Sequence, residues 1–132
     1  MNKPLRWKQS LAVLTLAVST LVFNAPALAH GSSKPLHGGI VQVSGETLME
    51  LVVGVDSVAL YVKDDDEDVA SATMIAKLSI AYKGAKSEVT LEPAAGNRFD
   101  GKGVKLGPGA KVGVVLINKA TQAKALASFT LP

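Results

Sequence analysis

Two histidines, His30 and His37, are the residues whose chemistry and spacing favour a metal site. If His30 becomes the first residue of the mature protein, its free α-amine and its imidazole Nδ1 can bind one metal ion in a six-membered chelate ring. His37 can add a third nitrogen, because seven residues of extended chain reach about 20 Å. Three nitrogens in a roughly planar arrangement suit Cu(II). We therefore predict a copper site at His30 and His37, with zinc or nickel as alternative metals. The competing interpretation is that His30 stands there by chance and that His37 only leads into the first strand.

The copper prediction depends on an N-terminal signal peptide. Residues 1–10 carry three basic residues, residues 11–23 are largely apolar, and small residues follow at Ala27 and Ala29. This is the order of a secretory signal and its cleavage site. The apolar run is shorter than the roughly 20 residues that cross a membrane, so we expect a signal peptide over residues 1–29 rather than a single-pass anchor. Cleavage after Ala27 is the second choice. We expect a periplasmic mature protein with no stable membrane anchor.

The charge of the chain does not indicate a nucleic-acid partner. The sequence has 14 Lys and Arg against 11 Asp and Glu, and its pI is about 9.2. Three of the basic residues lie in the predicted signal peptide, so the mature part has 11 of each and a net charge near zero. The mature part also lacks a basic stripe interleaved with aromatic residues, and we expect no nucleic-acid partner.

The sequence offers little for catalysis. It has no cysteine, which excludes thiol nucleophiles, thiolate metal ligands and iron–sulfur clusters. Its serines stand in no G-x-S-x-G context. Most of its candidate carboxylates alternate with apolar residues, which is typical of a solvated strand face rather than of a catalytic pair. We therefore predict that the protein is not an enzyme. These carboxylates are Glu50, Asp56, Glu88, Glu92 and Asp100.

Short strand-like runs separated by turn signals follow one another from residue 39 to the end of the chain. Their number and spacing predict an all-β fold, a small antiparallel β-sandwich that is immunoglobulin-like in the broad sense. We expect the sandwich domain over residues 39–132, a flexible N-terminal segment over residues 30–38, and a helical turn within residues 70–76. The predicted strands are residues 40–43, 47–53, 58–63, 69–70, 75–82, 87–92, 97–100, 112–117 and 125–131.

The acidic run from Asp64 to Asp68 is the most charged feature of the sequence. Its carboxylate oxygens would suit calcium or another hard cation, which is the functional interpretation. An EF-hand pattern, however, would need glycine and a carboxylate at the positions that Val69 and Ile75 occupy. We favour a solvated hairpin tip, because polar residues predominate in tight turns.

Several short motifs carry a family resemblance. They are His37-Gly38-Gly39 before apolar residues, Glu50-Leu51-Val52, Leu60-Tyr61-Val62, the set Leu91, Pro93 and Asn97, and Gly109 ahead of the strand at Val112. With them, the chain resembles small periplasmic proteins of heavy-metal efflux and copper-resistance systems, and an N-terminal domain of adaptors of metal-exporting RND pumps. Many of these proteins have a histidine near the hairpin tip, where this chain is acidic. A looser likeness is to small β-sandwich copper carriers whose mature chain begins with His, as His30 would here.

The resemblance implies a metal role for His37 and a metal efflux complex as partner. The predicted function is that of a periplasmic metal-binding accessory protein, copper favoured, which sequesters an ion or passes it on. The alternative is a metal-free β-sandwich interaction module of an envelope complex, which would dock through its edge strands.

Overall fold

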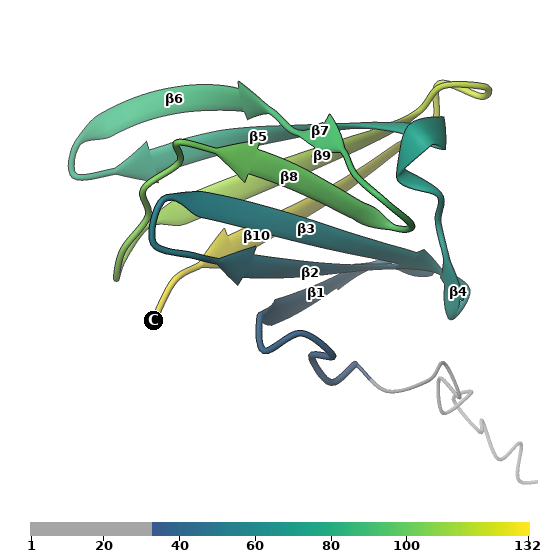
Figure 1. Ribbon diagram of the computed structural model, residues 1–132, viewed down its shortest axis with the longest axis horizontal. Helices are drawn as coiled ribbons and strands as arrows, with labels where there is room; N and C mark the ends of the chain where they lie inside the picture. Colours follow the sequence, from purple (N-terminus) through teal and green to yellow (C-terminus); the bar gives the residue numbers. More distant parts are fainter. Residues whose placement is uncertain (1–32) are drawn as a thin grey trace, which may run out of the picture.

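The computed structural model describes residues 33–132. The predicted signal peptide and His30 lie outside these described residues. Within them, two antiparallel sheets pack face to face as a sandwich (Figure 1). The predicted all-β sandwich is therefore confirmed. No helix of the described part is long and apolar enough to cross a membrane.

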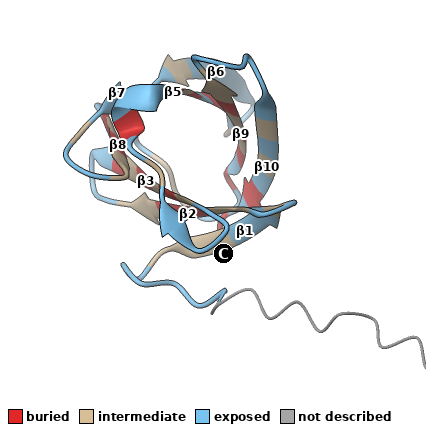
Figure 2. Ribbon diagram, turned by 90° about the vertical axis from the view of Figure 1, so that its right-hand side faces the viewer, coloured by how far each residue is buried: buried red, intermediate tan, exposed pale blue. Residues whose placement is uncertain are grey.

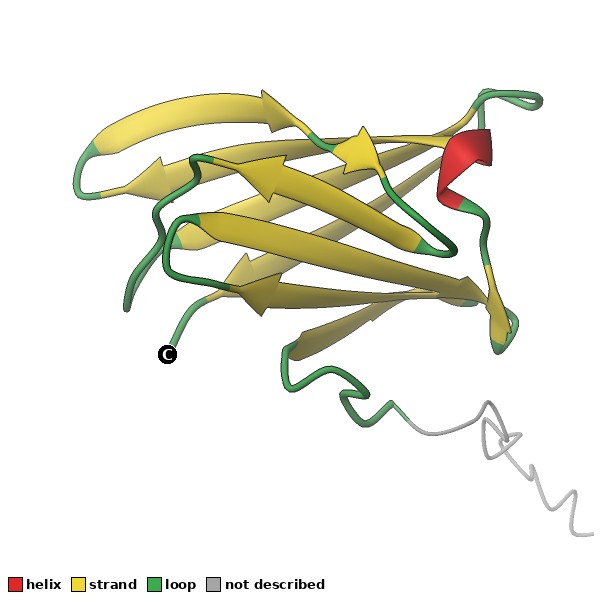
Figure 3. Cartoon of the chain, in the orientation of Figure 1, coloured by secondary structure: helices red, strands yellow, loops and turns green. Residues whose placement is uncertain are grey.

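The larger sheet has six strands in the order β1-β2-β3-β8-β7, with the short β4 paired to β3. Every pair of neighbouring strands in this sheet is antiparallel. Figure 3 shows the turns that connect them. Its strands are β1 (Ile40–Ser44), β2 (Thr47–Val53), β3 (Ser57–Asp64), β4 (Glu67–Asp68), β7 (Glu92–Pro93) and β8 (Arg98–Lys102).

The smaller sheet has four strands in the order β10-β9-β5-β6. A single 3-10 turn, η1 (Ser71–Thr73), precedes β5 and falls within the predicted helical turn. The edge strands β1 and β10 of the two sheets lie close together without forming a strand pair (Figure 2). The strands are β5 (Met74–Tyr82), β6 (Ala85–Thr90), β9 (Lys111–Asn118) and β10 (Lys124–Thr130).

The core lies between the sheets and follows the period of two along each strand (Figure 2). Buried residues alternate with more exposed ones along β3, β5 and β9. Phe99 and Phe129, the two largest fully buried side chains, come from β8 and β10, so each sheet contributes one of them to the core. The alternating residues from the three strands are Val58, Leu60, Val62, Met74, Ala76, Leu78, Ile80, Val112, Val114 and Leu116.

Two predicted strands differ from the structure. The predicted strand at residues 69–70 is wrong, because the short pairing with β3 is made by Glu67 and Asp68 instead. The predicted strand 87–92 is divided into β6 and β7, which belong to different sheets. The division falls at Leu91, whose side chain is buried while its N–H bonds to the Ala76 carbonyl at 2.9 Å.

The acidic run forms the exposed turn between β3 and β4. Asp65 and Asp66 have φ values of 49° and 63°, the left-handed conformation that a two-residue type I′ hairpin turn requires. All five acidic residues are exposed. The predicted solvated hairpin tip is therefore correct, and residues 33–132 contain no group of three or more His, Cys, Asp or Glu side chains placed to hold a metal ion.

The core makes a direct test of the sandwich possible. Leu60 is fully buried between Leu51 and Phe99 on the neighbouring strands. We expect Leu60→Asp to abolish folding, because an unpaired buried charge costs several kcal/mol against a total stability of roughly 5–15 kcal/mol. The matched control is Leu126→Asp, since Leu126 is 61% exposed. Far-UV circular dichroism should show a folded β spectrum for the control only, and a folded Leu60→Asp protein would contradict the packing.

Candidate functional site

Glu50 is a buried carboxylate on the outer face of the six-stranded sheet. Its neighbours in β2, Met49 and Leu51, point into the core, so the period of two turns Glu50 outward. Nevertheless Glu50 is only 2% exposed. It is paired with Val41 of β1 and Tyr61 of β3. The chain ahead of β1 covers it, because that segment bonds directly to the carboxylate.

Four hydrogen bonds converge on the two carboxylate oxygens of Glu50. Its Oε1 accepts the Leu36 N–H at 3.0 Å and lies 3.0 Å from His37 Nδ1. Its Oε2 accepts the His37 N–H at 2.8 Å and the Gly39 N–H at 2.9 Å. Three backbone N–H groups and one imidazole of residues 36–39 thus surround the carboxylate.

The two glycines of the His37-Gly38-Gly39 motif each meet a geometric requirement of this contact. Gly38 has φ of 73°, a left-handed conformation that side chains disfavour. A Cβ on Gly39 would collide with the carbonyl oxygen of Leu51. The absence of side chains therefore lets the segment turn and approach β2 closely enough to reach Glu50.

The imidazole of His37 is held on two sides. Its ring stacks on the Tyr61 ring, with centroids 3.5 Å apart and an interplanar angle of 4°. Its Nδ1 faces Glu50 Oε1, and an Nδ1–H that donates to this carboxylate leaves the Nε2 lone pair unused by the contact. The His37 side chain is 39% exposed. A hollow of about 280 Å³, lined in part by Leu48, Lys63 and Tyr61, lies beside it.

The surroundings of Glu50 favour its charged form. Burial alone raises the pKa of Glu50. The hydrogen bonds from Gly39, from the His37 side chain and from the N–H groups of His37 and Leu36 lower it by more, so the pKa of Glu50 lies below its ordinary value. The site is therefore a buried carboxylate that is held in its charged form by four hydrogen bonds.

The structure describes one of the two predicted metal ligands. His37 lies at the site, while His30 lies outside the described residues and their proximity stays a prediction. The expectation of a solvated Glu50 is wrong, because residues 36–39 cover it. The contact of Tyr61 with His37 was not predicted either. Glu50 and Tyr61 lie in the short motifs Glu50-Leu51-Val52 and Leu60-Tyr61-Val62, and these motifs were the available signal.

The chain was compared with models of known protein families, with curated proteins and with solved structures, and none of the three comparisons finds a match.

The buried carboxylate predicts a measurable loss of stability on neutralisation. Glu50→Gln keeps the size of the side chain but offers only one acceptor oxygen to four donors. Buried donors left without a partner cost about 1–3 kcal/mol, so we expect a loss of that size in chemical denaturation at neutral pH. Glu88→Gln, at an exposed position, should change stability by less than about 0.5 kcal/mol. Equal losses of stability for Glu50→Gln and Glu88→Gln would show that the hydrogen bonds to Glu50 do not stabilise the fold.

Glu50 also predicts an acid-dependent part of the stability. Because its pKa in the folded protein is lowered, its contribution is fully present above the ordinary glutamate pKa. The contribution decreases as the pH falls below that value and is lost once the pH passes the lowered pKa of the folded state. Denaturation over this acidic range should therefore bring the wild type and Glu50→Gln closer together. A difference that stays constant with pH would show that the charge of Glu50 does not matter.

Proposed function

We propose that the protein is a periplasmic metal-binding accessory protein, with Cu(II) as the favoured ion and zinc or nickel as alternatives. The supporting observation is the arrangement of His37, whose Nδ1 faces a buried carboxylate and whose ring is stacked on Tyr61. Histidines that ligate metals usually donate their second ring N–H to a carboxylate or carbonyl, which fixes the tautomer and the ring orientation. Here that arrangement would leave Nε2 as the ligand.

The remaining ligands in this proposal come from His30. One imidazole is too few for a stable site, and the described residues offer no cluster of three ligands. The α-amine and imidazole of an N-terminal His30 would supply two nitrogens, and Nε2 of His37 would supply the third. A site of three nitrogens suits Cu(II) and leaves a coordination position open.

The proposed role is to sequester the ion or to pass it to an efflux complex. His37 is partly exposed, and handover requires ligands that a partner can reach. Glu50 and Tyr61 would keep the imidazole in place whether or not the ion is bound, because their contacts do not use Nε2.

The test is copper titration of protein exported from the full-length chain. Intact mass should first show a chain that begins at His30, since a chain beginning at Leu28 would remove the chelate. A second form carries one Met inserted between Ala29 and His30, so that the α-amine moves away from the imidazole. We expect its Cu(II) affinity, measured calorimetrically, to fall by more than about tenfold, which corresponds to about 1.4 kcal/mol.

Two further variants separate metal binding from folding. His37→Ala removes one nitrogen and should weaken Cu(II) binding less than the inserted Met, because the two-nitrogen chelate remains. Tyr61→Leu removes the stacking surface but no ligand, so copper binding should largely persist. If the Met-extended protein binds copper as tightly as the native form, the N-terminal site is wrong.

That result would favour the second candidate function, a metal-free interaction module. The observation in its favour is that β1 and β10 each pair on one side only and lie close together. Exposed apolar side chains occur on both strands, Val43 at 53% and Leu126 at 61%. Unpaired strand edges of this kind can accept a strand from a partner.

A further inference from the structure

The outer face of the four-stranded sheet is a basic surface with no ion-pair partners among the described residues. Four exposed lysines point outward from it, one on each strand: Lys124, Lys111, Lys77 and Lys86. None of the four makes a salt bridge within residues 33–132. The only outward carboxylate of these strands is Glu88. The predicted mature chain has a net charge near zero, so a face with four lysines and one carboxylate is more basic than the chain as a whole.

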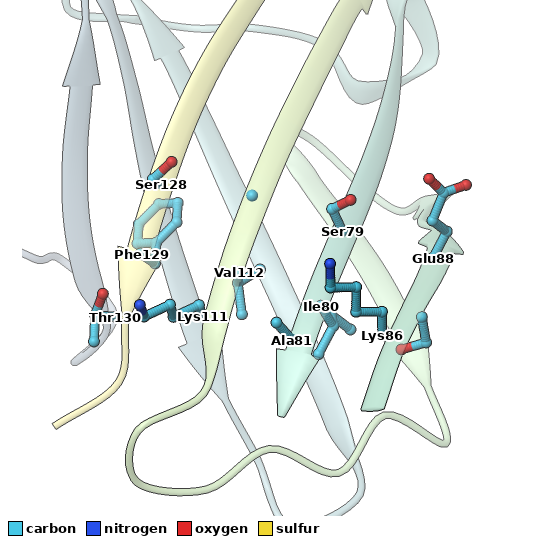
Figure 4. A pocket seen from close by; sticks show the side chains of 12 residues that line it. Ser79, Ile80, Ala81, Lys86, Glu88, Lys111, Val112, Ser128, Phe129 and Thr130 are labelled. Atoms are coloured by element: carbon cyan, nitrogen blue, oxygen red, sulfur yellow. The ribbon is translucent and has the colours of Figure 1, made fainter. Parts of the chain in front are cut away.

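A hollow of about 580 Å³ lies in this face. The strand register places its side chains in two rows across the sheet, as seen in Figure 4. One row is Ser128, Gly113, Ser79 and Glu88, and the other is Thr130, Lys111, Ala81 and Lys86. Small side chains therefore form the floor, hydroxyl groups are available for hydrogen bonds, and the charged residues of the two rows are Lys111, Lys86 and Glu88.

Gly113 has no structural requirement to be glycine. Each of the other described glycines either has a positive φ or would bring an added Cβ into collision. Gly113 has neither property, since its added Cβ would lie at an ordinary contact distance of 3.6 Å from Ser79 Cβ. Glycine inside a strand weakens the sheet and often marks a place where a ligand or another backbone approaches closely. Its position at the centre of the hollow fits that second role.

We propose that this face docks an extended acidic segment of a partner protein. The outward lysines complement carboxylates: Lys111 and Lys86 share one row of the hollow, and Lys77 and Lys124 lie beyond its other row. The Gly113 floor gives room for the partner backbone. A concave surface with hydroxyl donors suits directional bonds to a peptide better than contact with the plane of a lipid bilayer.

The test uses the protein exported from the full-length chain and a labelled peptide of alternating glutamate and serine, about twelve residues long. We expect binding by fluorescence anisotropy at low ionic strength and progressive loss as salt screens the charges. The double variant Lys86→Glu and Lys111→Glu should lower the affinity at least about tenfold. Lys102→Glu, an exposed lysine on β8 of the other sheet, should leave it nearly unchanged.

A substitution in the floor distinguishes docking from general attraction between charges. Gly113→Val should weaken peptide binding while the thermal midpoint stays equal or rises, because valine favours strands. If the valine protein fails to fold, Gly113→Ala provides the same comparison with a smaller side chain.

Three results would overturn the proposal. The first is no binding of the acidic peptide by the wild type at low ionic strength. The second is equal loss with Lys102→Glu, which would indicate unspecific charge attraction. The third is lysine-dependent binding to vesicles of phosphatidylglycerol and phosphatidylcholine without peptide binding, which would identify a lipid surface as the occupant.

Discussion

The carboxylate of Glu50 is the interaction on which the arrangement of the candidate site depends. A charge can be removed from water only when several partners replace the solvent. Here the partners are three backbone N–H groups and one imidazole, all from Leu36 to Gly39. The same hydrogen bonds also constrain residues 36–39, because the N–H groups of three of them must point at the carboxylate. The buried carboxylate thereby holds residues 36–39 against β2 and, together with the stacking on Tyr61, orients the His37 ring so that an Nδ1–H donor leaves Nε2 available.

The fold was accessible from the sequence because the sandwich core follows a local rule. Apolar residues at alternate positions, such as Val58, Leu60 and Val62, predict both the strand and its buried face. The same rule could not detect the break at Leu91, since Val89 and Leu91 keep their alternation while the chain passes from one sheet to the other. Both residues point to the same interior from either sheet, so their pattern is unchanged.

The site was only partly accessible for a different reason. His37 could be singled out by its chemistry, and its glycines by the turn that they imply. The alternation also correctly turned Glu50 outward. The burial of Glu50, however, depends on hydrogen bonds from residues that lie 11 to 14 positions earlier in the sequence. The periodicity of the sequence does not reveal such contacts. The collision that excludes a side chain at Gly39 likewise becomes visible only when β1 and β2 are placed together.

Because Leu36 and His37 are held at Glu50, the chain that precedes them is tethered close to the site. The tether raises the local concentration of His30 near His37. Covalent connection limits His30 to within about 25 Å of His37, whatever path the intervening residues take. Groups joined by so short a connection meet at an effective concentration of about millimolar. In the proposed copper site, an ion chelated by the α-amine and imidazole of His30 would therefore reach His37 without a high concentration of protein, and a competing partner could displace the three nitrogens one at a time.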